Sequence, residues 1–523
     1  MEFKDINEFE KATKRGRRET LRLGIALIFV VLVMLFTSLS TGAEGPQGVM
    51  LVIAAMIGGY MAMNIGANDV ANNVGPAVGS RAISMTGAII IAAVFEMAGA
   101  LIAGGDVVAT VQKGIINPAM IADTDRFILV MIAALLAGAI WLNIATASGA
   151  PVSTTHSIIG AVLGAGIASG GMAAAQWSKL LEIAASWVIS PVLGGVVAAG
   201  FLYWIKHSIT YREDMVAAAR RMVPILIGLM AFAFTTYLIL KGLNKVMKVG
   251  ILPAMTAGAL LGLFTFALLR RSIDKKFSTL ENTKQSINTL FTIPLICAAA
   301  LLSFAHGAND VANAVGPLAA IADVAKSGLV SAKASIPLWV MMVGASGIAL
   351  GLLLYGPKLI RTVGSEITEL DQMRAFCIAM SAALTVIVAS QLGLPVSSTH
   401  IAVGGVFGVG FLREFLKTSY SQMIDEIKEH HAGADKAMVE DFLNRFAKAG
   451  IEDKRLMLQQ LKARTAQADL SKLERKQIRK VYRHELVKRS ALFKIAAAWI
   501  ITVPISGILA AMIYYMMFGM LQA

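Results

Sequence analysis

The feature that most constrains this chain is a series of apolar runs, each close to the length that crosses a lipid bilayer. Of the 523 residues, 56% are apolar and only 15% are charged. A run of roughly 20 apolar residues spans the hydrocarbon core as a helix, because a helix satisfies every backbone N–H and C=O group internally. The sequence therefore predicts an all-α polytopic membrane protein, and we expect it in the plasma (inner) membrane.

The basic residues of the chain do not indicate a nucleic-acid partner, although the formal net charge is +14. Lys and Arg concentrate in the loops between apolar runs, where they act as signals for the cytosolic side. Cys297 and Cys377 both lie in apolar runs, which disfavours a disulfide framework. We therefore expect a lipid-embedded protein that binds no nucleic acid.

The first apolar run, residues 23–39, follows a basic stretch at 14–18 and so resembles a signal peptide. The run is long and lacks a convincing exit of small residues, which favours a retained helix. We expect residues 1–48 to form a cytosolic N-terminus and an additional first transmembrane helix.

Two polar motifs occur twice, in the same order. Gly-Ala-Asn-Asp-Val-Ala-Asn begins at Gly66 and at Gly307, and Pro-Val-Ser-Thr/Ser-Thr-His begins at Pro151 and at Pro395. The offset is 310 − 69 = 241 residues for the first motif and 397 − 153 = 244 residues for the second. Two motifs repeated at nearly the same offset indicate an internal duplication.

The two copies are expected to have opposite orientations in the membrane. Seven apolar runs separate the start of one copy from the start of the other, and an odd number of crossings inverts the second copy. The basic loops 206–221 and 270–284 are expected in the cytosol, and the acidic loop 105–125 outside. Three residues disagree, because the count places them outside: Lys241, Lys245 and Lys248.

The duplication divides the chain into two transport repeats and several additions. The expected parts after residue 48 are a first transport repeat (49–206), connecting transmembrane helices (207–287), a second, inverted repeat (288–411), a cytosolic charged helical insert (412–490) and a final transmembrane helix (491–523). The insert is rich in charged residues, with apolar residues at helical spacing. We interpret it as a solvated helical appendage, with a regulatory or dimerising role as the alternative.

The Asn-Asp motifs supply ligands for a hard cation. Their glycines and the Gly-Pro that follows predict broken helices, and a broken helix frees backbone carbonyl oxygens to join the carboxylate. Na⁺ prefers such oxygen ligands, and side chains three or four residues apart share a helical face. The candidate cation ligands are Asn68, Asp69, Asn72, Asn309, Asp310 and Asn313.

The Pro-Val-Ser motifs predict two helix starts inside the membrane, re-entrant in character. Pro suits the first turn and Ser or Thr suits the cap. Free N–H groups, the positive end of the helix dipole and consecutive hydroxyls suit a tetrahedral oxyanion, and without Arg they permit its release. The candidate oxyanion ligands are Ser153, Thr154, Thr155, Ser397, Ser398 and Thr399.

Three further residues have two interpretations each. Glu96 is an intramembrane carboxylate without an acidic counterpart in the second copy, and it is either a coupling residue or a structural hydrogen-bond partner. His156 and His400 either hold the helix starts in place as neutral imidazoles or couple transport to protons.

The spacing of Gly160 and Gly164, repeated at Gly404 and Gly408, predicts close helix packing.

Together the duplicated motifs resemble the PiT family of inorganic phosphate transporters, over about residues 49–411. The resemblance implies cation-coupled phosphate uptake, driven by Na⁺ or H⁺, in a homodimer. It also implies that the Asp and Asn positions hold cations and that the Ser and Thr positions hold phosphate. The family often carries Gln near the second helix start, and Gln391 fits that position as a phosphate ligand, although the first copy has Ala147 there.

We therefore expect a secondary active transporter that needs no cofactor besides its coupling cation and works by alternating access. A P-loop is absent from the sequence, so an ion gradient must supply the energy. A permease for sulfate or another tetrahedral oxyanion is the nearest alternative, followed by an anion channel. A membrane phosphotransferase using Ser153 and His156 lacks an orienting carboxylate nearby.

Overall fold

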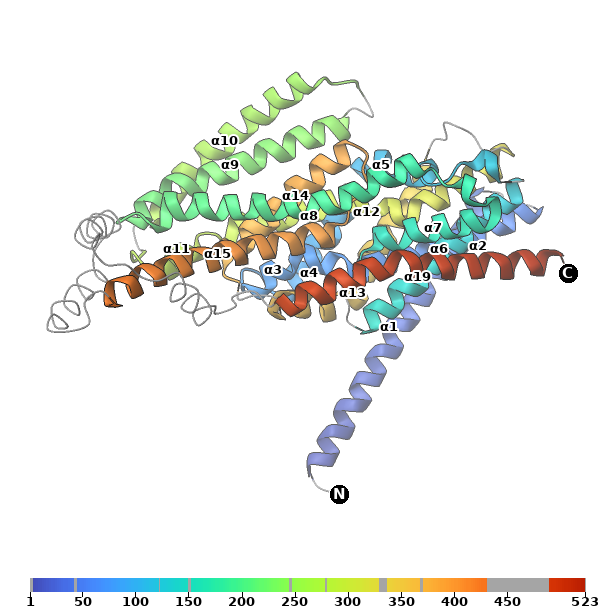
Figure 1. Cartoon of the computed structure of the whole chain (residues 1–523), viewed down its shortest axis with the longest axis horizontal. Helices are drawn as coiled ribbons and strands as arrows, with labels where there is room; N and C mark the ends of the chain where they lie inside the picture. Colours follow the sequence, from blue (N-terminus) through green and yellow to red (C-terminus); the bar gives the residue numbers. More distant parts are fainter. Residues whose placement is uncertain are drawn as a thin grey trace.

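The structure is a computed structural model that describes residues 3–41, 45–121, 123–148, 152–243, 247–277, 280–328, 336–366, 370–429 and 489–522. Its regular elements are helices (Figure 1). Within these described ranges, eleven helices are long and apolar enough to cross a membrane. The prediction of an all-α polytopic membrane protein is confirmed.

The helices follow one another in the order of the chain. The first part contains α1 (Phe3–Thr41), α2 (Gly45–Asn68), α3 (Val70–Gly79), α4 (Met85–Ala103), α5 (Gly105–Lys113), α6 (Thr124–Ser148), α7 (Thr154–Gly170) and α8 (Trp177–Ile205). The second part contains α9 (Met215–Lys241), α10 (Ile251–Phe277), α11 (Lys284–Thr289), α12 (Thr292–Ser327), α13 (Leu338–Glu366), α14 (Gln372–Gln391), α15 (Ser398–Glu429) and α19 (Arg489–Gln522). Short 3₁₀ turns at Pro118–Met120 and Met172–Ala174 and a π-turn, η3 (Lys206–Thr210), complete the order.

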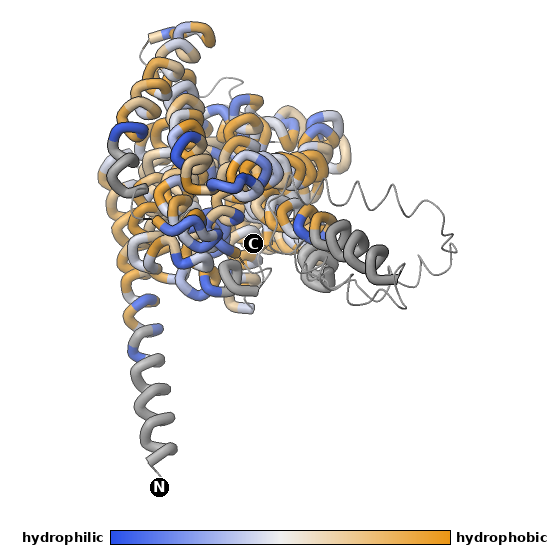
Figure 2. The backbone as a smooth tube through the Cα atoms, turned by 90° about the vertical axis from the view of Figure 1, so that its left-hand side faces the viewer, coloured by the Kyte–Doolittle hydropathy of each residue, from blue (hydrophilic) through white to orange (hydrophobic). Residues whose placement is uncertain are grey.

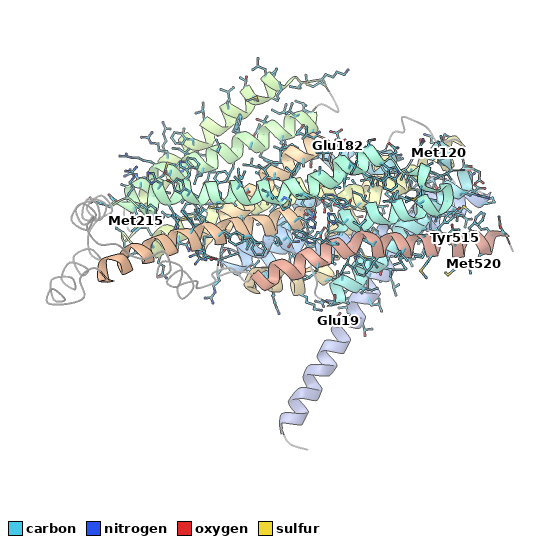
Figure 3. All side chains as sticks on the ribbon, viewed as in Figure 1. Glu19, Met120, Glu182, Met215, Tyr515 and Met520 are labelled. Atoms are coloured by element: carbon cyan, nitrogen blue, oxygen red, sulfur yellow. The ribbon has the colours of Figure 1, made fainter. Side chains whose placement is uncertain are left out.

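The bundle has two ends, which we name after residues labelled in Figure 3: the Met120 end, which also carries Met520, and the Met215 end opposite. The side chain of Asn282 donates to Glu213 O at 2.7 Å and accepts from Met215 N at 3.0 Å. The two basic loops thus share the Met215 end, in agreement with their predicted common side. Residues 430–488, most of the expected insert, lie outside the described residues.

One of the three lysines that disagreed with the predicted topology has an acidic partner. Lys241, at the end of α9, forms an ion pair with Asp106 of the acidic loop. A basic residue that neutralises an acidic neighbour is compatible with the side on which the acidic loop lies. Lys241 therefore does not contradict the crossing count; Lys245 lies outside the described residues.

Two helical hairpins enter the bundle from opposite ends. The α6–α7 hairpin belongs to the Met120 end, because Gly170 at the end of α7 lies against Met120. With 17 residues, α7 is about 25 Å long at 1.5 Å per residue, too short to cross a core of ~30 Å. The α14–α15 hairpin belongs to the Met215 end and starts beside Asn288, which accepts from Met373 N. The tips meet in the interior, where Thr155 Oγ1 donates to Val396 O at 3.1 Å.

Both hairpins return through helices capped by serine, as predicted. Ser153 Oγ accepts from His156 N at 3.2 Å, and Ser397 Oγ accepts from His400 N at 3.3 Å. The expected position of proline in the first turn is wrong: Pro395 lies two residues before the cap, and Pro151 lies outside the described residues. Val396, between Pro395 and Ser397, lies before the helix begins.

The two Asn-Asp motifs differ in their backbone. In the first copy α2 ends at Asn68 and α3 begins at Val70, but Asp69 between them keeps right-handed helical backbone angles and donates to Ile65 O at 2.9 Å, so the predicted break amounts to an interruption at one residue. In the second copy α12 runs unbroken for 36 residues, so a break there is the wrong expectation. Proline inside α12 removes one N–H donor but does not end the helix: Pro317 cannot donate to the carbonyl of Asn313.

Small residues allow the hairpins to approach their neighbours closely. A Cβ atom added at Gly408 would lie 2.0 Å from Gly195 O of α8, and one at Gly164 would lie 2.1 Å from Gly507 O of α19. Helix α8 therefore packs on α15 as α19 packs on α7, which confirms the predicted close packing. Figure 2 shows that hydrophobic residues predominate over the bundle, as expected for a lipid-facing surface.

Candidate functional site

The two hairpin tips and the two Asn-Asp motifs converge on one buried cluster. Asp69 and Thr154 are at most 1% exposed, as are Asp310 and Thr399. Thr154 Oγ1 donates to Asp69 Oδ2 at 2.6 Å and lies 3.2 Å from Asp310 Oδ2. Thr399 Oγ1 donates to Asp69 Oδ1 at 3.1 Å. Carboxylates and hydroxyls that the sequence assigned to two kinds of ligand are therefore in direct contact.

The amides of the cluster make matching contacts in the two copies. Asn72 Nδ2 donates to Thr399 Oγ1 at 2.9 Å, and Asn313 Nδ2 donates to Thr155 Oγ1 at 3.2 Å and to Thr154 Oγ1 at 3.1 Å. By the two sequence offsets, 72 + 241 = 313 and 155 + 244 = 399. Each Asn-Asp motif thus contacts the helix start of the other copy.

A second pair of amides ties the motifs to the hairpins. Asn68 hydrogen-bonds the hydroxyl of Thr146 at 3.0 Å, and Asn309 Nδ2 donates to Ser390 Oγ at 3.0 Å. The offsets again match, because 68 + 241 = 309 and 146 + 244 = 390. Thr146 and Ser390 precede the hairpin tips and could have been found from the sequence by applying the offset to every hydroxyl residue.

Several buried polar atoms of the cluster have no hydrogen-bond partner among the described residues. They include Asn72 Oδ1, Asn313 Oδ1, Asp310 Oδ1 and Ser398 Oγ. Leaving a buried acceptor or donor unsatisfied costs about 1–3 kcal/mol for each group. Four such atoms in one cluster indicate groups that a ligand would satisfy.

A residue that sequence reasoning missed connects Glu96 to the cluster. His306 Nδ1 lies 2.7 Å from Glu96 Oε2, and His306 Nε2 lies 3.1 Å from Asp310 Oδ2. Asn73 Nδ2 donates to Glu96 Oε1 at 2.7 Å. His306 precedes Asp310 by four residues inside an apolar run, which was the available signal; the first copy has Ile65 at the matching position, so the repeat did not point to it.

The cluster carries an excess of acidic groups. The buried polar and charged residues that the structure describes include the carboxyl groups of Asp69, Glu96 and Asp310 but no Lys or Arg. Ligand atoms of Asp69, His306 and Asp310 lie within 4.8 Å of one another. Buried like charges are stable only with counter-charges or protons. The residues therefore fit a bound cation or proton.

The remaining predicted residues lie beside the cluster or apart from it. His156 and His400 pack together with ring centroids 4.4 Å apart. His156 lies tilted against Trp187 at 3.8 Å, and His400 stacks on Trp499 at 3.5 Å. These contacts favour the packing interpretation of both histidines. Gln391 is exposed at the end of α14, so the structure does not bring it to the buried cluster.

The bridge through His306 leads to a testable expectation. Replacing His306 by Gln leaves two buried carboxyl groups without their shared partner, which we expect to destabilise the fold by about 3–5 kcal/mol. Thermal unfolding in detergent measures this loss, with His207→Gln, an exposed histidine, as the matched control. Adding Glu96→Gln should restore part of the loss, because it removes one unpaired carboxyl group. Equal losses in the single and double variants would contradict the bridge.

Comparisons with known proteins define the class. A profile of the phosphate transporter family matches residues 65–510. A Helicobacter pylori protein named "Putative phosphate permease" is 55% identical over 98% of each chain, and a Pyrococcus furiosus protein with that description is 42% identical over 69% of this chain and 87% of its own. A solved structure described as "The sodium-dependent phosphate transporter" is 31% identical, with a TM-score of 0.73 over 90% of this chain and 99% of that one.

Fold, cluster and comparisons agree on a multi-pass membrane transporter and not an enzyme. The chain belongs to the phosphate transporter family. The resemblance seen in the duplicated motifs is confirmed, and the phosphotransferase alternative is excluded. In the structure Ser153 Oγ caps a helix while the His156 ring packs against Trp187, which is no arrangement for a nucleophile and its base.

Proposed function

We propose that this chain imports inorganic phosphate coupled to a cation, Na⁺ or H⁺, by alternating access. The observation that carries the proposal is the buried cluster, in which two carboxyl groups, four amides and the hydroxyls of two helix starts meet. Phosphate as the substrate rests on the family. Sodium as the coupling ion is supported by the structural relative, which is described as sodium-dependent.

The oxyanion would bind between the N-termini of α7 and α15. Ser398 Oγ has no partner among the described residues, and Thr154 and Thr399 donate to Asp69, so their hydroxyl hydrogens could turn to a phosphate oxygen. Helix N-termini add N–H groups and a positive dipole. Ser153, Thr155 and Ser397 complete the set of six hydroxyls, with cap or backbone hydrogen bonds that hold the tips in shape.

The cation would bind on the carboxyl side of the same cluster. Asp69 and Asp310 supply carboxylate oxygens, and Asn72 and Asn313 each have a side-chain oxygen without a partner in the described residues. Pro76 and Pro317 lie four residues after these asparagines and cannot donate to their carbonyl oxygens. A cation at the carboxylates would lower the repulsion between the acidic residues and the phosphate. Bound cation and phosphate would thus stabilise each other.

The inverted repeat remains part of the proposal, with one extension. Matching contacts support two inverted halves: those of Asn72 and Asn313 cross between the copies, those of Asn68 and Asn309 lie within each copy, and the hairpins enter from opposite ends. Because α19 packs on α7 as α8 packs on α15, we infer that the second repeat comprises residues 288–411 and α19, with the insert between them. A homodimer, a cytosolic N-terminus and a plasma-membrane location complete the proposal.

Uptake by proteoliposomes tests the proposal. We expect saturable uptake of radiolabelled phosphate when a Na⁺ gradient or a pH gradient is imposed, and little uptake without either. Excess unlabelled phosphate should abolish the signal, and excess sulfate should leave it unchanged. Equal competition by sulfate would support the general oxyanion permease, and flux that does not saturate or depend on a gradient would indicate a channel.

A further inference from the structure

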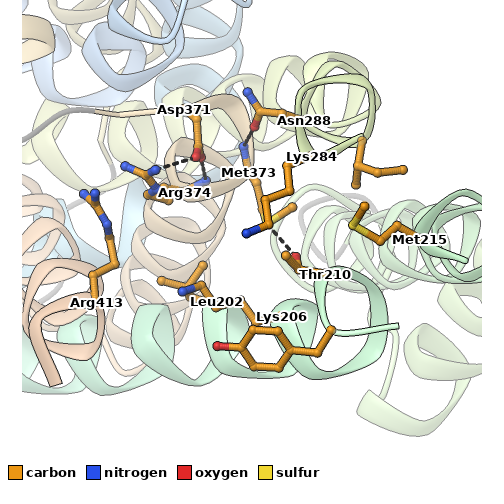
Figure 4. Close-up of a pocket in the computed structure, with 12 residues that line it drawn as sticks. Leu202, Lys206, Thr210, Met215, Lys284, Asn288, Asp371, Met373, Arg374 and Arg413 are labelled. Carbon is orange, nitrogen blue, oxygen red and sulfur yellow. Dashed lines mark hydrogen bonds and ion pairs between the residues drawn. The ribbon is translucent and has the colours of Figure 1, made fainter. Parts of the chain in front are cut away.

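A cavity at the Met215 end is lined by more positive than negative side chains. Its volume is about 200 Å³, and its charged lining residues are Lys206, Lys284, Arg374, Arg413 and Asp371 (Figure 4). They come from η3, α11, α14, α15 and the N-cap of α14. Segments distant in the sequence therefore bring four cationic groups and one carboxylate to one cavity.

The carboxylate offsets only part of this charge. Asp371 Oδ2 lies 2.8 Å from Arg374 Nη2, an ion pair drawn as a dashed line in Figure 4. Counting the charged lining residues gives four positive and one negative, a net of +3. The cations are near one another, because Arg374, Arg413 and Lys284 all repel the positive charge of Lys206. The cavity therefore favours an anion.

The backbone presents Lys206 to the cavity in an uncommon way. Helix α8 ends in the π-turn η3, which carries Lys206 and Thr210, both of which line the cavity. π-Turns are rare and occur frequently at functional sites. The N-terminus of α14, a helix of 20 residues, lies at the same cavity and adds its positive dipole end.

The cavity is separate from the buried cluster. Helix α15 starts at Ser398 in the cluster, and Arg413 lies 413 − 398 = 15 residues further on, about 22 Å along the helix at 1.5 Å per residue. Cluster and cavity therefore do not share a ligand, although α15 connects them directly.

We propose that this cavity at the Met215 end of the bundle binds a phosphate group. The group belongs either to inorganic phosphate or to the headgroup of an anionic lipid. A volume below the ~300 Å³ of ordinary small-molecule pockets fits a single phosphate group. Two lysines and two arginines supply many donors for its oxygens, and such charge-assisted hydrogen bonds are the strong ones. The inference does not depend on which ion drives transport.

Binding to the purified full chain tests the inference, with one arm for each source of the phosphate group. Equilibrium dialysis measures radiolabelled inorganic phosphate bound to protein in neutral detergent at low salt. Native mass spectrometry measures phosphatidylglycerol retained after exchange from mixed micelles. The pocket variant combines Lys206→Gln with Arg413→Gln, and the control combines Arg270→Gln with Arg271→Gln, two exposed arginines of the basic loop with the same change in charge.

We expect the pocket variant to bind at least about tenfold more weakly than the control in one of the two arms, because two charged donors are lost. Loss in the dialysis arm identifies inorganic phosphate, and loss in the lipid arm identifies the headgroup. Lys284→Gln removes one exposed charge and should give a smaller loss of binding. This single variant replaces the double variant as the test if the double variant does not fold. Equal binding by pocket variants and control in both arms would overturn the inference.

Dialysis also separates this inference from the proposed transport site. Phosphate bound in the cluster should respond to Asp310→Asn and to added Na⁺, whereas phosphate bound in the cavity should respond to the pocket variant alone. If the cluster binds no phosphate but the pocket variant loses binding, the inference stands without the transport proposal. If the cluster binds phosphate and the pocket variant behaves as the control does, the transport proposal stands without the inference.

Discussion

Replacing Asp310 by Asn is expected to lower gradient-driven phosphate uptake by roughly 100-fold or more, because breaking a buried charge interaction costs about 3–5 kcal/mol. Asp310 Oδ2 lies 3.1 Å from His306 Nε2 and 3.2 Å from Thr154 Oγ1, so its charge influences both the acidic side and the hydroxyl side of the cluster. Asn keeps the size of the side chain and removes the charge. Uptake by proteoliposomes with equal amounts of inserted protein measures the effect, and Asp69→Asn should behave similarly.

The matched control for this prediction is Glu182→Gln. Glu182 is exposed and pairs with Lys179 at 2.8 Å on the surface of α8, where an ion pair contributes little. The control should retain nearly full uptake. If Asp310→Asn also retained full uptake at normal expression, the assignment of the carboxylates to the coupling cation would be wrong.

Replacing Thr154 by Val is expected to raise the apparent KM for phosphate at least tenfold. The change keeps the branched shape and removes a hydroxyl that contacts Asp69, Asp310 and Asn313. A lost hydrogen bond to a charged group is worth about 1.5–3 kcal/mol, which corresponds to about tenfold or more in affinity. Initial uptake rates over a range of phosphate concentrations measure the effect.

Two controls make the Thr154 prediction specific. Thr154→Ser retains the hydroxyl and should restore most of the affinity, whereas a purely steric role would not be restored. Thr265→Val removes an exposed hydroxyl of α10 that only donates to Leu261 O within its own helix. A KM that stays unchanged in Thr154→Val would place the oxyanion away from the start of α7.

Much of the site was predictable because the duplication supplied an internal comparison. Asp69 and Asp310 align with each other, as do Thr155 and Thr399, and residues repeated at matched spacing come together in the structure. The crossed pattern of contacts was not predictable in detail. An offset in the sequence says which residues are equivalent but not whether each motif contacts its own copy or the other one.

Other features of the site could not be predicted from the sequence, and the reason differs from residue to residue. His306 occurs in one copy only, so a search for repeated residues passes over it. The one-residue interruption at the first motif and the continuous helix at the second arise from nearly the same residues, so the local sequence alone does not decide between them. Gln391 matches the family pattern, yet the helix end places its side chain on the exposed side.

The role of α19 depends on spatial contacts that the sequence pattern does not reveal. The insert separates α19 from the other helices of its copy, and its Gly507 and Trp499 show no motif of the duplicated kind. In the structure Gly507 lies against Gly164, and Trp499 stacks on His400. Helix α19 thus contacts α7 in its second half and the first turn of α15.

The central claim is that one cluster between the two hairpin tips holds the cation and the phosphate together. A cryo-EM structure of the full chain with Na⁺ and phosphate tests it most directly. We predict tetrahedral density within hydrogen-bond distance of Ser398 Oγ at the starts of α7 and α15, beside a cation bound by Asp69 or Asp310. Phosphate density elsewhere, with the hydrogen bonds from Thr154 and Thr399 to Asp69 intact, would contradict it.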